Sequence, residues 1–305
     1  MSRKVHSVAV AGGRGNVGTP VVTNLLAHGF DVTILVRKSS DTSSLPTSAK
    51  VKKVDFESTD DLTAALSGQD AFVDCTLVQD DTPKRLIDAS LAAGVYRYIP
   101  SDWSVDPLNN AANSLPVFSK RVERDNYLYE RCKSSNGKMT WTIVANGPFL
   151  DWNLRTGFMG INLFEKRAEL MDGGDNRVVW TTLESVGKAV AGVMEHPEET
   201  ENRPVYVQSV VKSCHEMLKH AQAALGTDGW QVVSVNAEEA NNKALGDLFS
   251  GKFDMSTFGT MIRFANSRSE TSAPWVKSDN GLLRVPSMSD GDLEGLIRSI
   301  AKTAA

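Results

Sequence analysis

A glycine-rich segment near the N-terminus is the clearest chemical signal in the sequence. It follows an apolar run over residues 5–11 and precedes a segment with helical spacing. In a strand–loop–helix unit, Gly12 permits the tight turn, Gly15 lets the backbone approach a pyrophosphate, and Gly18 allows close helix–strand packing. The helix N-terminus adds free N–H groups and a partial positive charge. We therefore expect a dinucleotide, rather than a merely structural turn, at Gly12, Gly13, Arg14, Gly15, Asn16, Val17 and Gly18.

Two cations indicate which dinucleotide to expect. In NAD sites an acidic residue usually ends the second strand, roughly 20 residues beyond the loop, and holds the ribose 2′-hydroxyl. Here Arg37 and Lys38 occupy that place. Both cations can pair with the 2′-phosphate of NADP, and an arginine can do so through two parallel hydrogen bonds. The sequence favours NADP(H) over NAD(H); the alternative is a strand that simply ends in solvated cations.

Strand-like and helix-like segments alternate in the first half of the chain. Compact apolar runs predict strands over 5–11, 31–36, 51–56, 71–77, 96–100 and 139–145. Helical spacing and glycine stops predict helices over 16–28, 59–66, 83–93 and 119–133. This alternation predicts an α/β fold with a doubly wound parallel sheet, the NAD(P)-binding Rossmann fold.

The pattern changes after Pro148. Helices are predicted over 183–195, 214–225 and 290–304, and a lone strand over 205–208. We expect residues 1–150 to form the NADP-binding Rossmann domain. Residues 151–305 are expected to form a smaller substrate lobe, with some segments returning to the Rossmann sheet.

Several further motifs share one family pattern. They are Val36-Arg37-Lys38, Val54-Asp55-Phe56, Arg97-Tyr98-Ile99-Pro100-Ser101-Asp102 with Asp106-Pro107, Pro116-Val117-Phe118-Ser119-Lys120 and Trp141-Thr142-Ile143-Val144. With the glycine loop, they resemble the NmrA-like / isoflavone reductase-like family of atypical short-chain dehydrogenases. The run Asn146-Gly147-Pro148-Phe149-Leu150-Asp151-Trp152 resembles fungal members in particular. The likeness covers most of the chain to about residue 210.

The resemblance implies NADPH, a cleft between a large cofactor domain and a small substrate domain, and a lysine near the nicotinamide. That lysine maps onto Lys120. Plant reductases of the family usually have an acidic-aromatic-glycine run where this chain has Asp102-Trp103-Ser104. The resemblance therefore does not carry the plant substrates over to this chain.

A second catalytic pattern competes with Lys120. Conventional short-chain dehydrogenases use Tyr-x-x-x-Lys, and the chain contains Tyr129-Glu130-Arg131-Cys132-Lys133 in the same predicted helix. Tyr129 lies roughly 180° around this helix from Lys120 and roughly 13 Å further along its axis, whereas Tyr127 lies on nearly the same face as Lys120. Ligands of Rossmann proteins bind at the carboxyl ends of the strands, where this helix begins. We expect Lys120 to be catalytic, Tyr129 to pack and Lys133 to be solvated. An ordinary first-turn lysine is the alternative for Lys120.

Residues at the ends of other strands complete the expected site. The fourth and fifth strands end near Leu77 and Ser101, beside the place of a nicotinamide. An aromatic-rich stretch follows the sixth strand, although such residues at helical spacing also form cores. Cofactor contacts are expected from Thr76, Leu77, Ser101, Lys120, Asn146 and Phe149. Substrate contacts are expected from Asp102, Trp103, Phe149, Trp152 and Phe158, with Trp180 as a further wall residue. For Asp102 the alternative is a turn cap.

Composition excludes several classes of protein. The chain has 305 residues and a net charge of −4, which gives no reason to expect nucleic acid or an acidic membrane as partner. No stretch reaches the ~20 apolar residues of a membrane span, and the N-terminus lacks signal-peptide features, so we expect a cytoplasmic location. The cysteines and histidines show no metal-ligand spacing, and no metal is expected. A monomer and a homodimer are both compatible with the sequence.

These features favour an NADPH-dependent reductase of a small hydrophobic metabolite of secondary metabolism. The substrate would be aromatic or polyketide-like, with a ketone, an enone or an activated ether as the reducible group. One alternative is an NADP(H)-sensing regulator of the NmrA type, which binds the cofactor and a protein partner without chemistry. Another is a redox-neutral isomerase that uses the same scaffold. A positioned cation at Lys120 separates the reductase from the sensor, because a sensor has no need for one.

Overall fold

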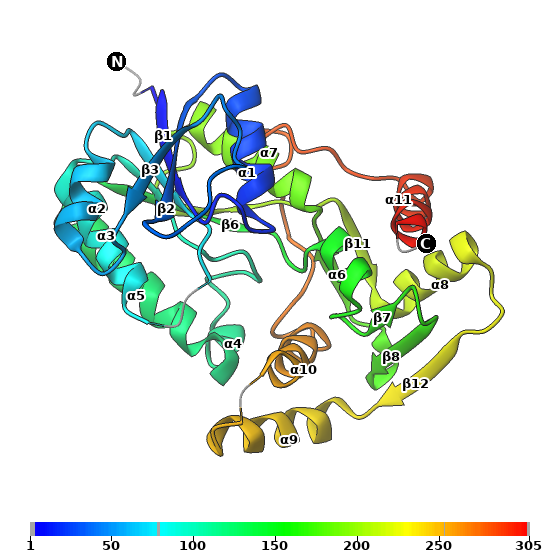
Figure 1. Cartoon of the computed structure of the whole chain (residues 1–305). Coiled ribbons are helices and arrows are strands. Elements are labelled where there is room, and N and C mark those ends of the chain that lie inside the picture. The colour runs from blue at the N-terminus through cyan, green and yellow to red at the C-terminus, as the bar shows by residue number, and fades with distance from the viewer. Residues whose placement is uncertain (1–3, 78–79, 253, 304–305) are drawn as a thin grey trace.

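A parallel sheet forms the core of one half of the molecule, at the upper left of Figure 1. The computed structural model describes residues 4–77, 80–252 and 254–303. Within them, seven strands pair in the order β10-β6-β5-β4-β1-β2-β3, and every pairing is parallel. Their bounds are β1 (Ser7–Ala11), β2 (Asp31–Arg37), β3 (Lys50–Val54), β4 (Ala71–Asp74), β5 (Arg97–Ile99), β6 (Thr140–Ala145) and β10 (Arg203–Tyr206). The predicted doubly wound Rossmann sheet is confirmed.

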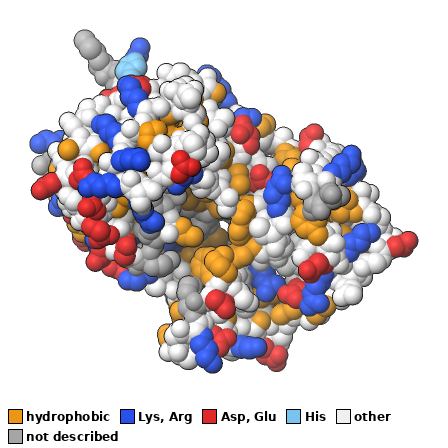
Figure 2. Space-filling view, in the orientation of Figure 1, with side chains coloured by type: hydrophobic (Ala, Val, Ile, Leu, Met, Phe, Trp, Pro, Cys, Tyr) orange, Lys and Arg blue, Asp and Glu red, His pale blue; other side chains and the backbone are white. Residues whose placement is uncertain are grey.

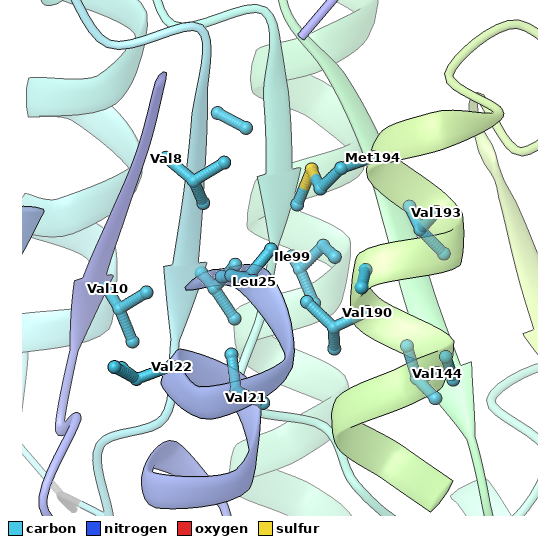
Figure 3. Packing of buried hydrophobic residues seen from close by; sticks show 14 of the residues in the cluster. Val8, Val10, Val21, Val22, Leu25, Ile99, Val144, Val190, Val193 and Met194 are labelled. Carbon is cyan, nitrogen blue, oxygen red and sulfur yellow. The ribbon is translucent and has the colours of Figure 1, made fainter. Parts of the chain in front are cut away.

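Helices cover both faces of this sheet. Strand β1 shows why, because Val8 and Val10 point to one face, Ala9 and Ala11 to the other, and all four are fully buried. Val8 and Val10 pack against α1 (Gly18–Ala27) and α7 (Leu183–Glu195), as Figure 3 shows. The opposite face carries α2 (Thr59–Leu66), α3 (Thr82–Ala93) and α5 (Ser119–Ser134).

A second core lies beside the sheet, in the green-to-red part of Figure 1. It is built by α6 (Leu150–Thr156), β7 (Ile161–Asn162), β8 (Arg167–Met171), β9 (Arg177–Trp180), β11 (Val210–Ser213), α8 (Cys214–Leu225) and α11 (Asp290–Lys302). Strand β12 (Gln231–Val235) pairs with β8. Two further helices, α9 (Ala237–Phe249) and α10 (Met255–Asn266), pack on each other. A small cluster joins α10 to α4 (Asn110–Asn113) and to the 3-10 helix η1 (Pro116–Phe118).

Part of the second half of the chain lies on the main sheet. The strand predicted over 205–208 overlaps only the end of β10, which pairs with β6, and α7 packs on α1. The second half of the chain also contains β7, β8, β9, β11 and β12, so the prediction of a lone strand there was wrong. Such short strands give weak signals: in β12 only Val235 is even partly buried. The division into domains at residue 150 stays a prediction.

Helices α1 and α7 approach closely at Gly187. A Cβ atom at this position would collide with the Pro20 carbonyl oxygen. We expect Gly187→Ala to lower the free energy of unfolding by about 1–3 kcal/mol, because close backbone packing leaves no room for the methyl group. The matched control is Gly246→Ala in α9, where a Cβ atom would meet no heavy atom within 4 Å. Alanine there should raise stability by up to about 1 kcal/mol. Urea unfolding measures both, and equal effects would contradict the close contact.

No helix within the described residues has the length and apolar character needed to cross a membrane.

Candidate functional site

The phosphate loop has the geometry that its glycines predict. Gly12 has a φ of +74°, and a Cβ atom there would collide with the Cys75 carbonyl oxygen at the end of β4. A Cβ atom at Gly18 would collide with the Gly12 carbonyl oxygen, so the start of α1 lies directly on the loop. At Gly15 the nearest neighbour of such an atom is the Gly12 oxygen, at 3.3 Å, and the rest of the space is open. This open, exposed backbone fits a bound pyrophosphate.

The cations near the second strand differ in their surroundings. Lys38 is ion-paired with Asp61 at 3.3 Å and with Asp55 at 3.8 Å. The exposed Arg37 guanidinium forms no ion pair or hydrogen bond with the described residues. Arg14 in the phosphate loop donates to the Asp41 carbonyl oxygen at 2.5 Å, in the segment after β2. Arg37 is therefore better placed than Lys38 to bind a 2′-phosphate, and Arg14 contacts the segment that follows Arg37.

The carboxyl ends of β4 and β5 are tied together. The Ser101 hydroxyl donates to the Thr76 carbonyl oxygen at 2.7 Å. The Thr76 amide and hydroxyl both donate to one oxygen of Asp74, at 2.8 and 2.6 Å. Asp74 is fully buried, and burial raises the pKa of its carboxyl group. Leu77 is 87% exposed. A nicotinamide expected at this edge would lie against a fixed backbone and an exposed apolar side chain.

Lys120 lies in the first turn of α5, at the edge of the sheet where ligands bind. Leu128 lies on the buried face of α5 and packs on the sheet. Arg124, one turn earlier on the same face, donates to the Ser101 carbonyl oxygen just beyond β5. Residues four apart share a helix face, so Lys120 lies one turn further still, past the carboxyl ends of the strands. Its side chain is 69% exposed and its ammonium lies 3.2 Å from Glu123. Lys84 of α3 binds the same carboxylate at 2.5 Å.

The competing tyrosine has a packing environment. The Tyr129 ring lies 4.4 Å from the Trp141 ring of β6, centroid to centroid. Its hydroxyl is buried without a hydrogen-bond partner among the described residues. Burial, followed by the charges of Asp125 and Asp102, raises the pKa of Tyr129. Lys133 is exposed. Proton transfer by a tyrosine near neutral pH requires the opposite shift.

Tyr127 is held away from the cleft as well. Its hydroxyl donates to Asp88 of α3 at 2.8 Å. Burial and this hydrogen bond raise the pKa of Tyr127. Of the α5 side chains considered as catalytic groups, Lys120 is the one that lies at the carboxyl ends of the strands.

Asp102 and Trp103 point to opposite faces of the sheet. Asp102 is 2% exposed, and its carboxylate lies 3.7 Å from Arg121 and 4.0 Å from Arg124, toward α5. Trp103 packs against the α1–α7 core. Burial and then the neighbouring Asp102 raise the pKa of Asp125, the partner of Arg124, to about 7. The burial of Asp102 favours a structural role over the direct substrate contact that the sequence suggested.

Aromatic side chains gather after the sixth strand. Trp152 contacts Phe158 with ring centroids 5.1 Å apart, and Phe158 lies 6.1 Å from Phe258 of α10. All three are partly exposed. Phe149 ends the loop before α6, whereas Asn146 is fully buried and its side-chain oxygen has no described hydrogen-bond partner. Figure 2 shows a hollow with hydrophobic walls between the Rossmann sheet and the second core. Trp180 was a wrong choice for a wall residue, because it is 1% exposed inside that second core.

Sequence reasoning missed Phe258 and the two buried arginines. For Arg124 a signal was present, because it shares an i, i+4 stripe with Leu128 and Cys132, both of which are buried. A charged residue on a buried stripe requires partners. For Phe258 the sequence held no signal that would bring α10 next to Phe158. In the described part of the chain, no three His, Cys, Asp or Glu residues gather as metal ligands.

Comparison with known proteins identifies the family. The sequence model of the NAD(P)H-binding family matches residues 12–197. The chain belongs to this family. An oxidoreductase named aprR from Aspergillus flavus is 36% identical over 249 residues, which cover 80% of this chain and 82% of that protein. An NmrA-like family domain-containing oxidoreductase from Gibberella moniliformis is 26% identical over 226 residues, or 67% of this chain and 72% of that protein.

Solved structures place this NmrA-like oxidoreductase in the same fold. A crystal structure of isoflavone reductase covers 98% of this chain and 100% of that chain, with a TM-score of 0.73 at 14% identity. The quinone oxidoreductase QOR2 of Escherichia coli, complexed with NADPH, covers the same shares with a TM-score of 0.70 at 16% identity. These structures confirm the NAD(P)H-binding fold. The NmrA-like family and the oxidoreductase class are confirmed by the family model and the two fungal oxidoreductases. The roles of the individual site residues stay predictions.

Proposed function

We propose that this oxidoreductase is an NADPH-dependent reductase of a small hydrophobic, aromatic or polyketide-like metabolite. The reducible group is a ketone, an enone or an activated ether. The observation that carries the proposal is the place of Lys120, one turn beyond the arginine that binds the end of β5. A hollow with hydrophobic walls lies between the two cores (Figure 2) and suits a substrate of this kind.

Different residues of the chain have different roles in such a reaction. When bound, NADPH supplies a hydride from its nicotinamide ring. The Lys120 ammonium stabilises the negative charge that develops on the substrate oxygen, or donates a proton to it. The Ser101–Thr76 link holds the backbone at the ends of β4 and β5. Trp152 and Phe158 contact the apolar part of the substrate and exclude water from the reacting atoms.

A preference for NADPH over NADH follows from Arg37. We expect NADPH to bind at least about tenfold more tightly, because one charge-assisted phosphate contact contributes roughly 1.5–3 kcal/mol. Arg37→Ala should weaken NADPH by about tenfold and leave NADH nearly unchanged. Tryptophan fluorescence titration measures both affinities. Lys38→Ala is the matched control: Lys38 is already paired with Asp55 and Asp61, so its loss should weaken NADPH less. Equal affinity of the native protein for the two cofactors would contradict this assignment.

The reductase itself is tested with a substrate panel. Aromatic ketones, enones and benzylic ethers are incubated with the protein and NADPH, and cofactor oxidation is followed at constant temperature. Oxidation that depends on one substrate class supports the proposal and names the reducible group. Failure of all classes, together with cofactor-dependent binding of a protein partner, would support the sensor instead. Conversion of a substrate without net cofactor oxidation would support the redox-neutral isomerase.

A further inference from the structure

Two largely buried arginines lie on helix α5 immediately after Lys120. The side chain of Arg121 is 9% exposed and that of Arg124 is 13% exposed. Burying a charged group is costly unless the group is paired and hydrogen-bonded. The hydrogen-bond and ion-pair partners of these two side chains therefore indicate their role.

Arg124 connects α5 to the end of β5. One terminal nitrogen, Nη1, donates to the Ser101 carbonyl oxygen at 2.6 Å. The other, Nη2, and Nε donate to Asp125 at 2.7 and 2.9 Å, and Nη2 lies 4.0 Å from Asp102. One guanidinium thus neutralises part of the acidic charge and also holds a backbone carbonyl group. A lysine has a single nitrogen and cannot span these partners in the same plane.

The link continues from Ser101 into β4. The Ser101 hydroxyl donates to the Thr76 carbonyl oxygen, and Thr76 donates twice to the buried Asp74. A continuous chain of hydrogen bonds therefore runs from α5 through the end of β5 to the end of β4. These are the two strand ends beside which the nicotinamide is expected.

Arg121 fastens the next part of the same loop. It donates to the Ser104 hydroxyl at 3.3 Å and to Asn113, and its guanidinium lies 4.5 Å from the centre of the Phe118 ring. The buried Asp102 carboxylate lies between the two arginines and has no direct hydrogen bond among the described residues. Arg121 thus holds the loop after Asp102, whereas Arg124 alone reaches Ser101.

We infer that Arg124 is a positioning residue. By binding the Ser101 carbonyl oxygen, it fixes the position of Lys120 relative to the nicotinamide. This inference rests on the proposed function, since it assumes that Lys120 faces the nicotinamide. Arg124 touches neither substrate nor cofactor in this role. Its effect is geometric: a shift of about 1 Å at a reacting centre can cost on the order of 10²-fold in rate.

The test uses Arg124→Lys in the full-length protein. Lysine keeps the cation beside Asp125, so the fold is not left with an uncompensated buried charge. The readout is the affinity for NADPH compared with that for 2′-phospho-ADP-ribose, which lacks the nicotinamide. We expect the affinity for 2′-phospho-ADP-ribose to change by less than about twofold. The affinity for NADPH should fall by about threefold or more, and the fluorescence of its bound nicotinamide should shift.

Activity gives the second readout, once a substrate is found. Arg124→Lys should lower kcat by about tenfold or more and change the KM of the substrate by less than about threefold. The control is Arg131→Lys on the same helix, where Arg131 pairs with Asp88 at 2.8 Å and is 39% exposed. This variant should match the native protein in every readout.

Some results would overturn the inference. One is an equal loss of affinity for both ligands, which would indicate general damage to the fold. Another is an unchanged affinity ratio and nicotinamide fluorescence. If Arg124→Lys does not fold, Arg124→Met with Asp125→Asn removes both charges of the pair and is read out in the same way. Because the ligand comparison needs no turnover, it can succeed where the substrate panel fails. Failure of the reductase proposal and failure of this inference are therefore distinguishable.

Discussion

Lys120→Ala should lower turnover by about 10²-fold or more while NADPH binds almost as tightly as before. A lost general acid or charge stabiliser has an effect of this size. The cofactor phosphates are expected at the glycine loop and near Arg37 rather than at α5, so cofactor affinity should change little. Steady-state kinetics and a fluorescence titration on the same preparation separate the two quantities. Lys120→Arg keeps a cation and should retain part of the activity.

Tyr129→Phe is the matched comparison for this prediction. Its hydroxyl is buried against the sheet without a described hydrogen-bond partner, and its ring packs on Trp141. Removing the oxygen should leave turnover nearly unchanged and should not lower stability, since no hydrogen bond is lost. An inactive Tyr129→Phe beside an active Lys120→Ala would return the protein to the Tyr-x-x-x-Lys mechanism.

The elements that the sequence predicted well are those buried in a regular pattern. Helix α7 runs over 183–195 as predicted, because Thr182 caps its start and its apolar positions recur with helical spacing. Strands β1, β2, β4 and β6 are mostly apolar runs buried on both faces, and this pattern is readable without a structure. The first helix begins at Gly18 rather than Asn16, because the phosphate loop takes up the residues before it.

The elements that the sequence did not predict depend on contacts between distant segments. Strand β12 is paired with β8, more than sixty residues earlier, and presents mostly exposed side chains. Its residues therefore carry no alternation that a reading of the sequence would recognise. The same holds for α10, whose Phe258 meets Phe158 only because two separate segments pack against each other.

In the candidate site, the backbone motif was more readable than the side chains. The glycine loop is recognised from the types and spacing of its residues, and at Gly12 and Gly18 a Cβ atom would collide with backbone atoms. Charged side chains are ambiguous, because the same residue types cover solvated helix faces and fill buried networks. Arg124 and Lys120 lie four residues apart in one helix; one is 13% exposed and the other 69% exposed. The difference arises from where the helix passes the end of the sheet, which depends on the fold.

Gly15→Val should abolish cofactor binding and leave the fold intact. The backbone at Gly15 does not require a glycine conformation, and a Cβ atom there would have only the Gly12 oxygen, at 3.3 Å, nearby. The branched side chain would instead fill the space in which the pyrophosphate must lie. Loss of two charge-assisted contacts of roughly 1.5–3 kcal/mol each would weaken NADPH by more than about 10²-fold. Fluorescence titration measures the affinity, and a thermal melt without cofactor measures the fold.

Gly18→Val separates the binding role of the loop from its structural role. A Cβ atom at Gly18 would collide with the Gly12 carbonyl oxygen and crowd the Gly13 backbone, neither of which is the end of a flexible side chain. This variant should therefore lower the melting temperature of the cofactor-free protein, whereas Gly15→Val should change it by no more than a few degrees. The two substitutions are thus expected to differ in their effect on the melting temperature, although both glycines belong to the same motif. Near-native NADPH affinity in Gly15→Val would show that the pyrophosphate does not lie on this loop.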